Sequence, residues 1–185
     1  RDRFLPKGIE LSDILKWPTK WKGETRVGSI LEHSLSAREL RKYTISERLW
    51  KSHQARKKRN KEMGRGFGYS LYYPEDLKTG TMSARYYKDG AEILISNGKK
   101  RNGEEKPPRK LTPRESARLQ GFPESFKLSD SNNEAYKQFG NAVNVRVVRL
   151  IAEKIITVMN EIENLKSYSK TGKIVSANNQ MKLDI

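Results

Sequence analysis

The sequence of 185 residues contains no cysteine, which excludes disulfide bonds, thiolate metal ligands and thiolate nucleophiles within these residues. Only two histidines are present, so we expect no metal site built by this chain. No apolar run is long enough to cross a bilayer, and no signal peptide is visible. These absences favour a cytoplasmic protein with no membrane partner.

Negative charge is also scarce, because 22 Asp and Glu stand against 38 Lys and Arg and leave a formal net charge of +16. The imbalance is concentrated in residues 1–110, which hold 27 basic against 14 acidic residues, whereas residues 111–185 hold 11 against 8. A basic excess of this kind attracts polyanions, and nucleic acid is the partner that we expect. An anionic membrane surface is the alternative, but no basic amphipathic helix with a bulky apolar face is visible.

A strongly basic helix is predicted from Ser46 to about Met63. Thr44 and Glu47 have the capping-box spacing at its start, and Gly64 follows its end. Its cations include Lys57, Lys58 and Arg59, and Arg65 follows closely. Two interpretations are open, namely a solvated charged face and a phosphate-facing surface, and the nearly one-sided charge favours the second.

Three stretches rich in aromatic and β-branched residues predict strands, with turn residues between them. The stretches are 67–73, 81–87 and 92–95. Side chains alternate faces along a strand, so Tyr86 and Tyr87 would lie on opposite faces, one in the core and one exposed. Residues 97–108 then predict a polar linker that contains glycine and proline.

Two further helices are predicted downstream. The first is capped by Thr112, with Pro113 at the first helical position and Glu115 at the third, and Gly121 closes it. The second runs from about residue 144 to 165, where an apolar seam would pack against a neighbour. The seam consists of Ile151, Ile155, Val158, Ile162 and Leu165. Near the N-terminus a packed loop is indicated by Trp17, Pro18 and Trp21.

Three parts of the sequence resemble the bacterial DNA cytosine-5 methyltransferases, and they follow one another in the order of that family. Residues 109–123 (RKLTPRESARLQGFP) closely resemble motif IX, and residues 139–145 (FGNAVNV) resemble motif X. Residues 66–69 (GFGY) and 81–95 (TMSARYYKDGAEILI) look like the target recognition domain of the Dcm-like subgroup. Short motifs are weak evidence singly, but three in family order make a specific resemblance.

The resemblance implies an α+β fold. A small mixed target-recognition domain with short strands would be followed by helices that pack on a Rossmann-like methyltransferase domain absent from this chain. Residues 1–110 would form the target recognition region, and residues 111–165 would form the motif IX and X helical region that completes the catalytic domain. Residues 166–185 would be a weakly ordered polar tail.

Methyl transfer in this family requires a cysteine thiolate, which adds to carbon 6 of cytosine so that carbon 5 can take the methyl group of S-adenosylmethionine. The chain has no cysteine, and it lacks the family's Pro-Cys loop and its N-terminal glycine-rich cofactor loop. We therefore expect the isolated chain to be inactive. The N-terminal catalytic half would be the rest of the same polypeptide, which the opening Arg1 slightly favours, or a separate subunit.

The resemblance and the charge pattern together give a set of residues expected to contact double-stranded DNA. They are Lys57, Lys58, Arg59, Arg65, Thr81, Ser83, Arg85, Tyr86 and Lys88. Thr81 would help to hold the backbone at a flipped-out base, or it is a strand threonine with no partner. Arg85 has the donors to grip guanine or phosphate. Its structural alternative is an ion pair with Asp89 or Glu92.

Motifs IX and X imply different roles. Motif IX would brace the recognition domain through Arg109, Thr112, Arg114, Glu115, Gln120 and Gly121. Motif X would place Asn141, Ala142 and Val143 beside the methionine part of S-adenosylmethionine. Asn141 has a second interpretation, in which it follows a turn at Gly140 and caps the last helix.

The leading functional hypothesis is therefore the DNA-recognition portion of a DNA cytosine-5 methyltransferase. The enzyme would belong to a restriction–modification system and methylate a short, C/G-rich site. The alternative is a noncatalytic basic module that binds DNA or RNA, and a basic ribosome-associated protein is a third possibility. Motif X favours the first hypothesis, because a mere binding module has no reason to keep a wall of the cofactor pocket.

Overall fold

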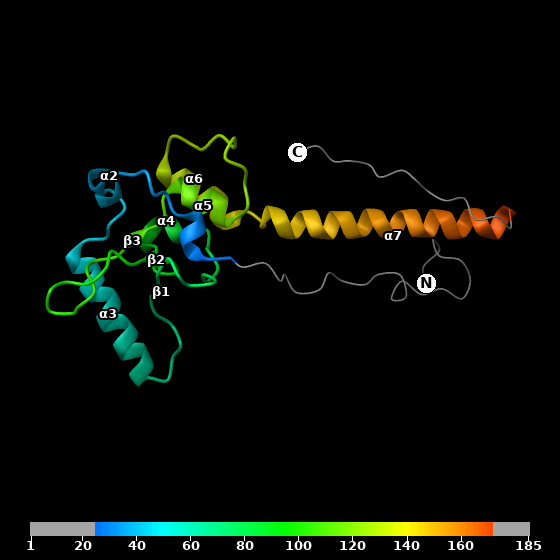
Figure 1. Cartoon of the computed structure of the whole chain (residues 1–185). Coiled ribbons are helices and arrows are strands. Elements are labelled where there is room, and N and C mark those ends of the chain that lie inside the picture. The colour runs from blue at the N-terminus through cyan, green and yellow to red at the C-terminus, as the bar shows by residue number, and fades with distance from the viewer. Residues whose placement is uncertain (1–24, 172–185) are drawn as a thin grey trace. The chain divides into compact units, whose positions relative to one another are not determined.

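The computed structural model describes residues 25–171, so the packed loop expected around Trp17 lies outside the described residues. Contacts divide the chain into two compact units. One unit is Lys22–Val145, and the other contains Arg1–Trp21 and Arg146–Ile185. The first unit holds every described element except helix α7, which we treat by itself (Figure 1).

The centre of the first unit is a small three-stranded sheet of β1 (Leu71–Tyr72), β2 (Leu94–Ile95) and β3 (Arg109–Lys110). The order is β1-β2-β3, with β1 parallel and β3 antiparallel to β2. With helices around this sheet, the fold is α+β, as predicted from the sequence. The strands at 67–73 and 92–95 were predicted too long, since only a pair of residues in each stretch joins the sheet.

The strand predicted at 81–87 is wrong. The chain from 81 to 85 is irregular, and residues Tyr86–Asp89 form the one-turn helix α4, which ends at Gly90 with φ 63°. Tyr86 is fully buried, and its hydroxyl donates to the carbonyl of Ile93 (2.7 Å) and accepts from the amide of Leu111 (2.8 Å). The burial and hydrogen bonding of this single side chain therefore outweigh the β-propensity of its neighbours.

Helix α3 (Glu47–Glu62) lies where the basic helix was predicted, but its cap is different. The Ser46 hydroxyl accepts from the amide of Leu49 (3.2 Å), whereas the Thr44 hydroxyl donates to the carbonyl of Leu40 (3.2 Å). Trp50 and His53 are the buried residues of this helix. Figure 1 shows α3 leading away from the sheet, with the following chain running back toward β1.

Short elements precede α3 and a turn follows β2. Helix η1 (Val27–Ile30) packs against α5, and α2 (Ala37–Arg41) starts with a complete capping box between Ser36 and Glu39. The segment 97–108, predicted as a linker, turns back on itself through a bridge between Lys99 and Glu105. Glu105 accepts hydrogen bonds from Tyr73 (2.8 Å) and Ser96 (2.9 Å), which fasten this turn to the sheet region.

Two helices complete the first unit. Helix α5 (Pro113–Leu119) has the predicted N-cap, and α6 (Asn132–Asn141) was not predicted. Helix α6 packs on α4 and α5, and the rings of Tyr136 and Tyr86 meet edge to face at 5.3 Å. The main core gathers here, with Phe139, Ile93 and Leu111 also buried.

Helix α7 (Val145–Thr171) begins close to the predicted position and continues past 165, so the predicted polar tail begins inside a helix. Of the predicted seam, Val158 is buried, whereas Ile151 and Ile155 are exposed. None of the helices in the described part of the chain is long and apolar enough to span a membrane.

Candidate nucleic-acid interface

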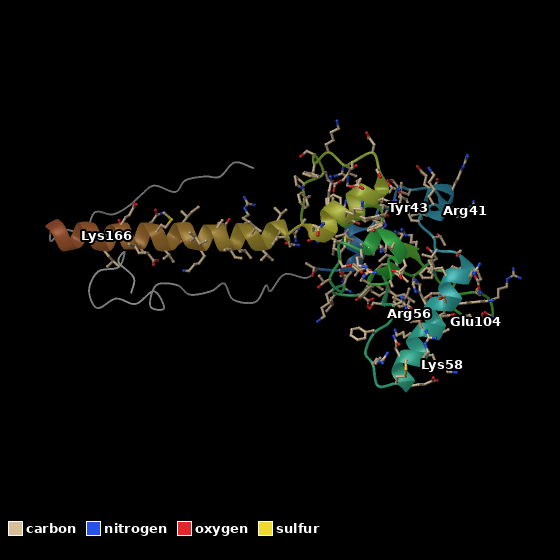
Figure 2. All side chains as sticks on the ribbon, turned by 180° about the vertical axis from the view of Figure 1, so that it is seen from behind. Arg41, Tyr43, Arg56, Lys58, Glu104 and Lys166 are labelled. Carbon is tan, nitrogen blue, oxygen red and sulfur yellow. The ribbon has the colours of Figure 1, made fainter. Side chains whose placement is uncertain are left out.

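The exposed face of α3 carries a cluster of cations. Lys57, Lys58 and Arg59 are all exposed, and Figure 2 shows Lys58 toward the end of α3 from which the next loop leaves. Within the described residues, Lys58 and Arg59 take part in no ion pair. Lys57 is held in place, because its Nζ donates to the carbonyl of Tyr69 (3.1 Å) and lies 4.3 Å from the centre of the Tyr69 ring.

The segment from Thr81 to Lys88 supplies a second group of exposed polar side chains. Thr81, Arg85 and Lys88 are exposed, and the Ser83 hydroxyl donates to a carboxylate oxygen of Glu92 (2.5 Å). Tyr86 must be removed from the predicted DNA contacts, because its side chain is fully buried in the core.

The ion pair considered for Arg85 does not form. Asp89 is engaged by Arg56 at 3.5 Å, and Glu92 is engaged by Ser83. Arg85 has no ion pair among the residues that the structure describes. Its guanidinium is therefore free of both carboxylates that were its structural alternative, and the residue is exposed.

A small polar network joins α3 to α4. The Arg56 guanidinium reaches Asp89 of α4 and also donates to Nδ1 of His53 (3.1 Å). Burial lowers the pKa of His53, with a further lowering contribution from Arg56 and an opposing one from Asp89. The neutral imidazole is the form that can accept a hydrogen bond from a guanidinium, which is only a donor.

Motif IX is built around a buried ion pair. Arg109 of β3 is 5% exposed and Glu115 of α5 is 0% exposed, and they form two hydrogen bonds of 2.7 and 2.9 Å. Glu115 also accepts from the amides of Thr112 (2.8 Å) and Glu32 (2.9 Å). The carboxylate thus caps its own helix, as predicted, and in addition ties the helix to β3 and to the chain near η1.

The other motif IX residues also have structural contacts. Arg114 donates to the carbonyl of Phe126 (3.0 Å), and Gln120 donates to that of Phe139 (2.8 Å) at the end of α6. Gly121 has φ 79°, the left-handed conformation expected just after a helix. These contacts give the motif IX residues structural partners within the unit.

Motif X differs from its prediction in one respect. Asn141 is the last residue of α6, so the interpretation of this residue as a cap for the last helix is wrong. The reason is α6 itself, which carries the chain in helical form through Gly140. Asn141 is exposed, Ala142 is half-buried and Val143 is 66% exposed. The three residues form an accessible break between α6 and the start of α7.

Sequence reasoning assigned no role to Glu32 or to His53. Glu32 acts through Glu115, which is 83 residues away along the chain, and no local signal marks it. His53 and Arg56 are three residues apart on α3, a spacing that places them on one face of the helix. Phe67 was noted only as part of the GFGY segment, and its place between two glycines next to a basic helix was a further signal. Within residues 25–171, no group of three or more His, Cys, Asp or Glu side chains could hold a metal ion.

Comparison with known proteins identifies the family to which this α+β chain with an exposed basic helix belongs. Residues 10–157 match the family of C-5 cytosine-specific DNA methylases. The chain therefore belongs to the C-5 cytosine-specific DNA methylase family.

Two relatives agree with this membership, and one solved structure shares the fold. The chain is 49% identical to the type II methyltransferase M1.ScrFI of Lactococcus lactis subsp. cremoris over 156 residues, which are 84% of this chain and 38% of that protein. It is 51% identical to the type II methyltransferase M.SsoII of Shigella sonnei, with the same coverage. The methyltransferase EhMeth of Entamoeba histolytica has the same fold, with a TM-score of 0.57 and 18% identity over 80% of this chain and 44% of that one. The chain thus spans about two fifths of the length of the relatives that it matches.

Proposed function

We propose that this chain is the DNA-recognition portion of a DNA cytosine-5 methyltransferase in a restriction–modification system. The observation that carries the proposal is the exposed basic face of α3, which the Arg56–Asp89 contact links to α4. Lysine and arginine side chains free of acidic partners neutralise phosphates, and exposed arginine can read guanine in the major groove. The substrate would be double-stranded DNA with a short, C/G-rich site.

The cofactor would contact the break that follows α6. Val143 presents an apolar side chain to solvent and Asn141 is exposed, and these groups suit the methionine part of S-adenosylmethionine. When bound, S-adenosylmethionine supplies the methyl group. The contribution of Asn141, Ala142 and Val143 is to bind and orient that part of the cofactor, while the rest of the pocket comes from outside these residues.

The partner would be the catalytic half of the enzyme. A thiolate nucleophile has to come from outside these 185 residues, because they contain no cysteine. Helix α7 offers apolar side chains for packing on a Rossmann-like domain. The exposed ones include Val148, Leu150, Ile151, Ile155 and Met159. A water-exposed apolar surface of this kind typically marks a protein interface.

Methyl incorporation tests the proposal. The chain alone, incubated with duplex DNA and S-adenosylmethionine, should transfer no methyl group to cytosine, and adding the cysteine-bearing half should restore transfer. Incorporation by the chain alone would contradict it. The alternative, a noncatalytic module, would bind DNA but would not restore methyl transfer when the catalytic half is added. The control is the same catalytic half joined to its own recognition part, which should be active.

A further inference from the structure

Phe67 is the most exposed large apolar residue of the described chain, at 78%. Single exposed apolar side chains are ordinary on protein surfaces, so exposure alone does not indicate a function. A functional role requires that the structure holds this ring outward, and the contacts of the loop between α3 and β1 show that it does.

The loop backbone is fastened to α3 on both sides of the exposed ring. The side-chain amide of Asn60 donates to the carbonyl of Phe67 (2.8 Å), and the Asn60 carbonyl accepts from the amide of Arg65 (2.8 Å). Gly68 lies against α3 so closely that an added Cβ would be 2.8 Å from Cγ of Lys57. The backbone is therefore bound while the aromatic ring remains in solvent.

Cations surround the ring. Phe67 lines an open depression of about 410 Å³ together with Lys57, Lys61, Arg65 and the half-buried Tyr69. Glu62 is the single acidic residue between positions 57 and 70. Such a concentration of positive charge attracts phosphate groups, and in a member of a DNA methylase family the phosphates of DNA are the ones expected to neutralise it.

We propose that Phe67 is a wedge that enters the stacked bases of duplex DNA while the cations beside it hold the phosphates. The inference rests on the proposed function and adds a residue-specific contact to it. Proteins that insert an apolar side chain at a base step must unstack that step, and the cost is offset by the added contacts. The fastening by Asn60 reduces the cost further, because the ring is presented without ordering the loop on binding.

The test compares the binding of the complete chain to two duplexes that differ by one central mismatched base pair. A mismatched step is easier to unstack, so a wedge should bind this duplex more tightly. Phe67→Ala should remove the preference and weaken binding to the mismatched duplex about fivefold or more, the loss expected for one base–aromatic stack. Phe67→Trp should keep the preference, and its fluorescence should be quenched by the mismatched duplex.

The control is Leu77→Ala, since Leu77 is 61% exposed and lies outside this loop. It should leave both affinities unchanged. The melting temperature of Phe67→Ala should equal that of the unaltered chain, because the ring makes little contact with the core.

Three results would overturn the inference. If Phe67→Ala bound both duplexes as the unaltered chain does, or lost affinity equally for both, Phe67 would not be a wedge. In either case charge reversal on α3 should still weaken binding to both duplexes, and the proposed function would stand. If the unaltered chain bound neither duplex at low salt, both the wedge and the proposed function would fall.

Discussion

Gly140 of motif X lies directly against the backbone of Ser83. A Cβ added to Gly140 would overlap the Ser83 carbonyl oxygen and approach Cα of Ala84 to 2.7 Å. The contact is between main chains, so no flexible side chain can move aside to relieve it. Helix α6 and the segment expected to contact DNA thus share one tightly fitted junction.

Gly140→Ala should therefore destabilise the protein. Glycine to alanine within a helix normally gains up to about 1 kcal/mol from helix propensity, but overpacking costs about 1–3 kcal/mol and a backbone clash lies at the upper end. Chemical denaturation should show a lower free energy of unfolding. The matched control is Gly66→Ala, where an added Cβ has no neighbour within 4 Å and the variant should unfold as the original does. Equal stability of the two variants would contradict the fit at Ser83.

The second prediction concerns the buried pair of Arg109 and Glu115. Glu115→Gln leaves the arginine charge buried without its counter-charge, and removing one member of a buried pair typically costs about 3–5 kcal/mol. The control is the ion pair of the half-buried Arg118 and the exposed Glu124, whose nearest atoms lie 2.7 Å apart. Glu124→Gln should cost no more than about 1 kcal/mol. Urea unfolding of both variants measures the difference, and similar losses would show that burial adds nothing to the motif IX pair.

The third prediction is a pH dependence of stability through His53. Burial lowers the pKa of His53 in the folded state, so the unfolded chain binds its proton more readily. The contribution of His53 to stability is present above the unfolded-state pKa of about 6.5 and is lost as the pH falls toward the folded-state value. His53→Asn keeps a hydrogen-bond acceptor near Arg56 but cannot be protonated. Between pH 7 and about pH 5, the free energy of unfolding should depend less on pH in this variant than in the original chain. An equal dependence on pH in both proteins would contradict the assignment.

The fourth prediction addresses the basic face of α3. Reversing the charges of Lys57, Lys58 and Arg59 should weaken binding to all duplexes similarly, because phosphate contacts carry no base identity. The slope of log K against log salt should fall by about 0.9 for each phosphate that the variant no longer neutralises.

A second triple variant controls for net charge. It reverses the exposed residues Arg38, Arg41 and Lys42 of the α2 region. This variant changes the net charge by the same amount and should keep most of the affinity if α3 is the phosphate-binding face. If the α3 variant kept both its affinity and its salt slope, the helix would be a solvated charged face.

The fifth prediction separates two residues of the segment that follows β1. In the assembled enzyme, Arg85→Ala should relax sequence preference by about 1–3 kcal/mol of discrimination, since its guanidinium has no carboxylate partner and is open to base edges. Thr81→Ala should lower binding or turnover on all sites alike. Methylation profiling over a library of sites distinguishes them, and an unchanged profile for Arg85→Ala would remove it from base reading.

Local chemistry made one part of the structure predictable from sequence. The helix start at Thr112 was predicted with its cap, its proline and its glutamate, because a capping box satisfies backbone donors within four neighbouring residues. The end at Gly121 follows from the same local logic, since glycine adopts the left-handed conformation without strain. The placement of α3 follows from its run of helix-forming residues before Gly64, and that of α7 follows from the helical spacing of its apolar residues.

Contacts between distant residues decided the rest. Tyr86 belongs to a β-favouring stretch, yet hydrogen bonds to Ile93 and Leu111 and a ring contact with Tyr136 hold it in a helical turn. Helix α6 was missed because its few apolar residues, Ala135, Tyr136 and Phe139, become meaningful only when α4 and α5 cover them. By itself the sequence determined the family, the charge and the locally capped helices. The tertiary structure decided which side chains are buried, because burial depends on neighbours that are remote along the chain.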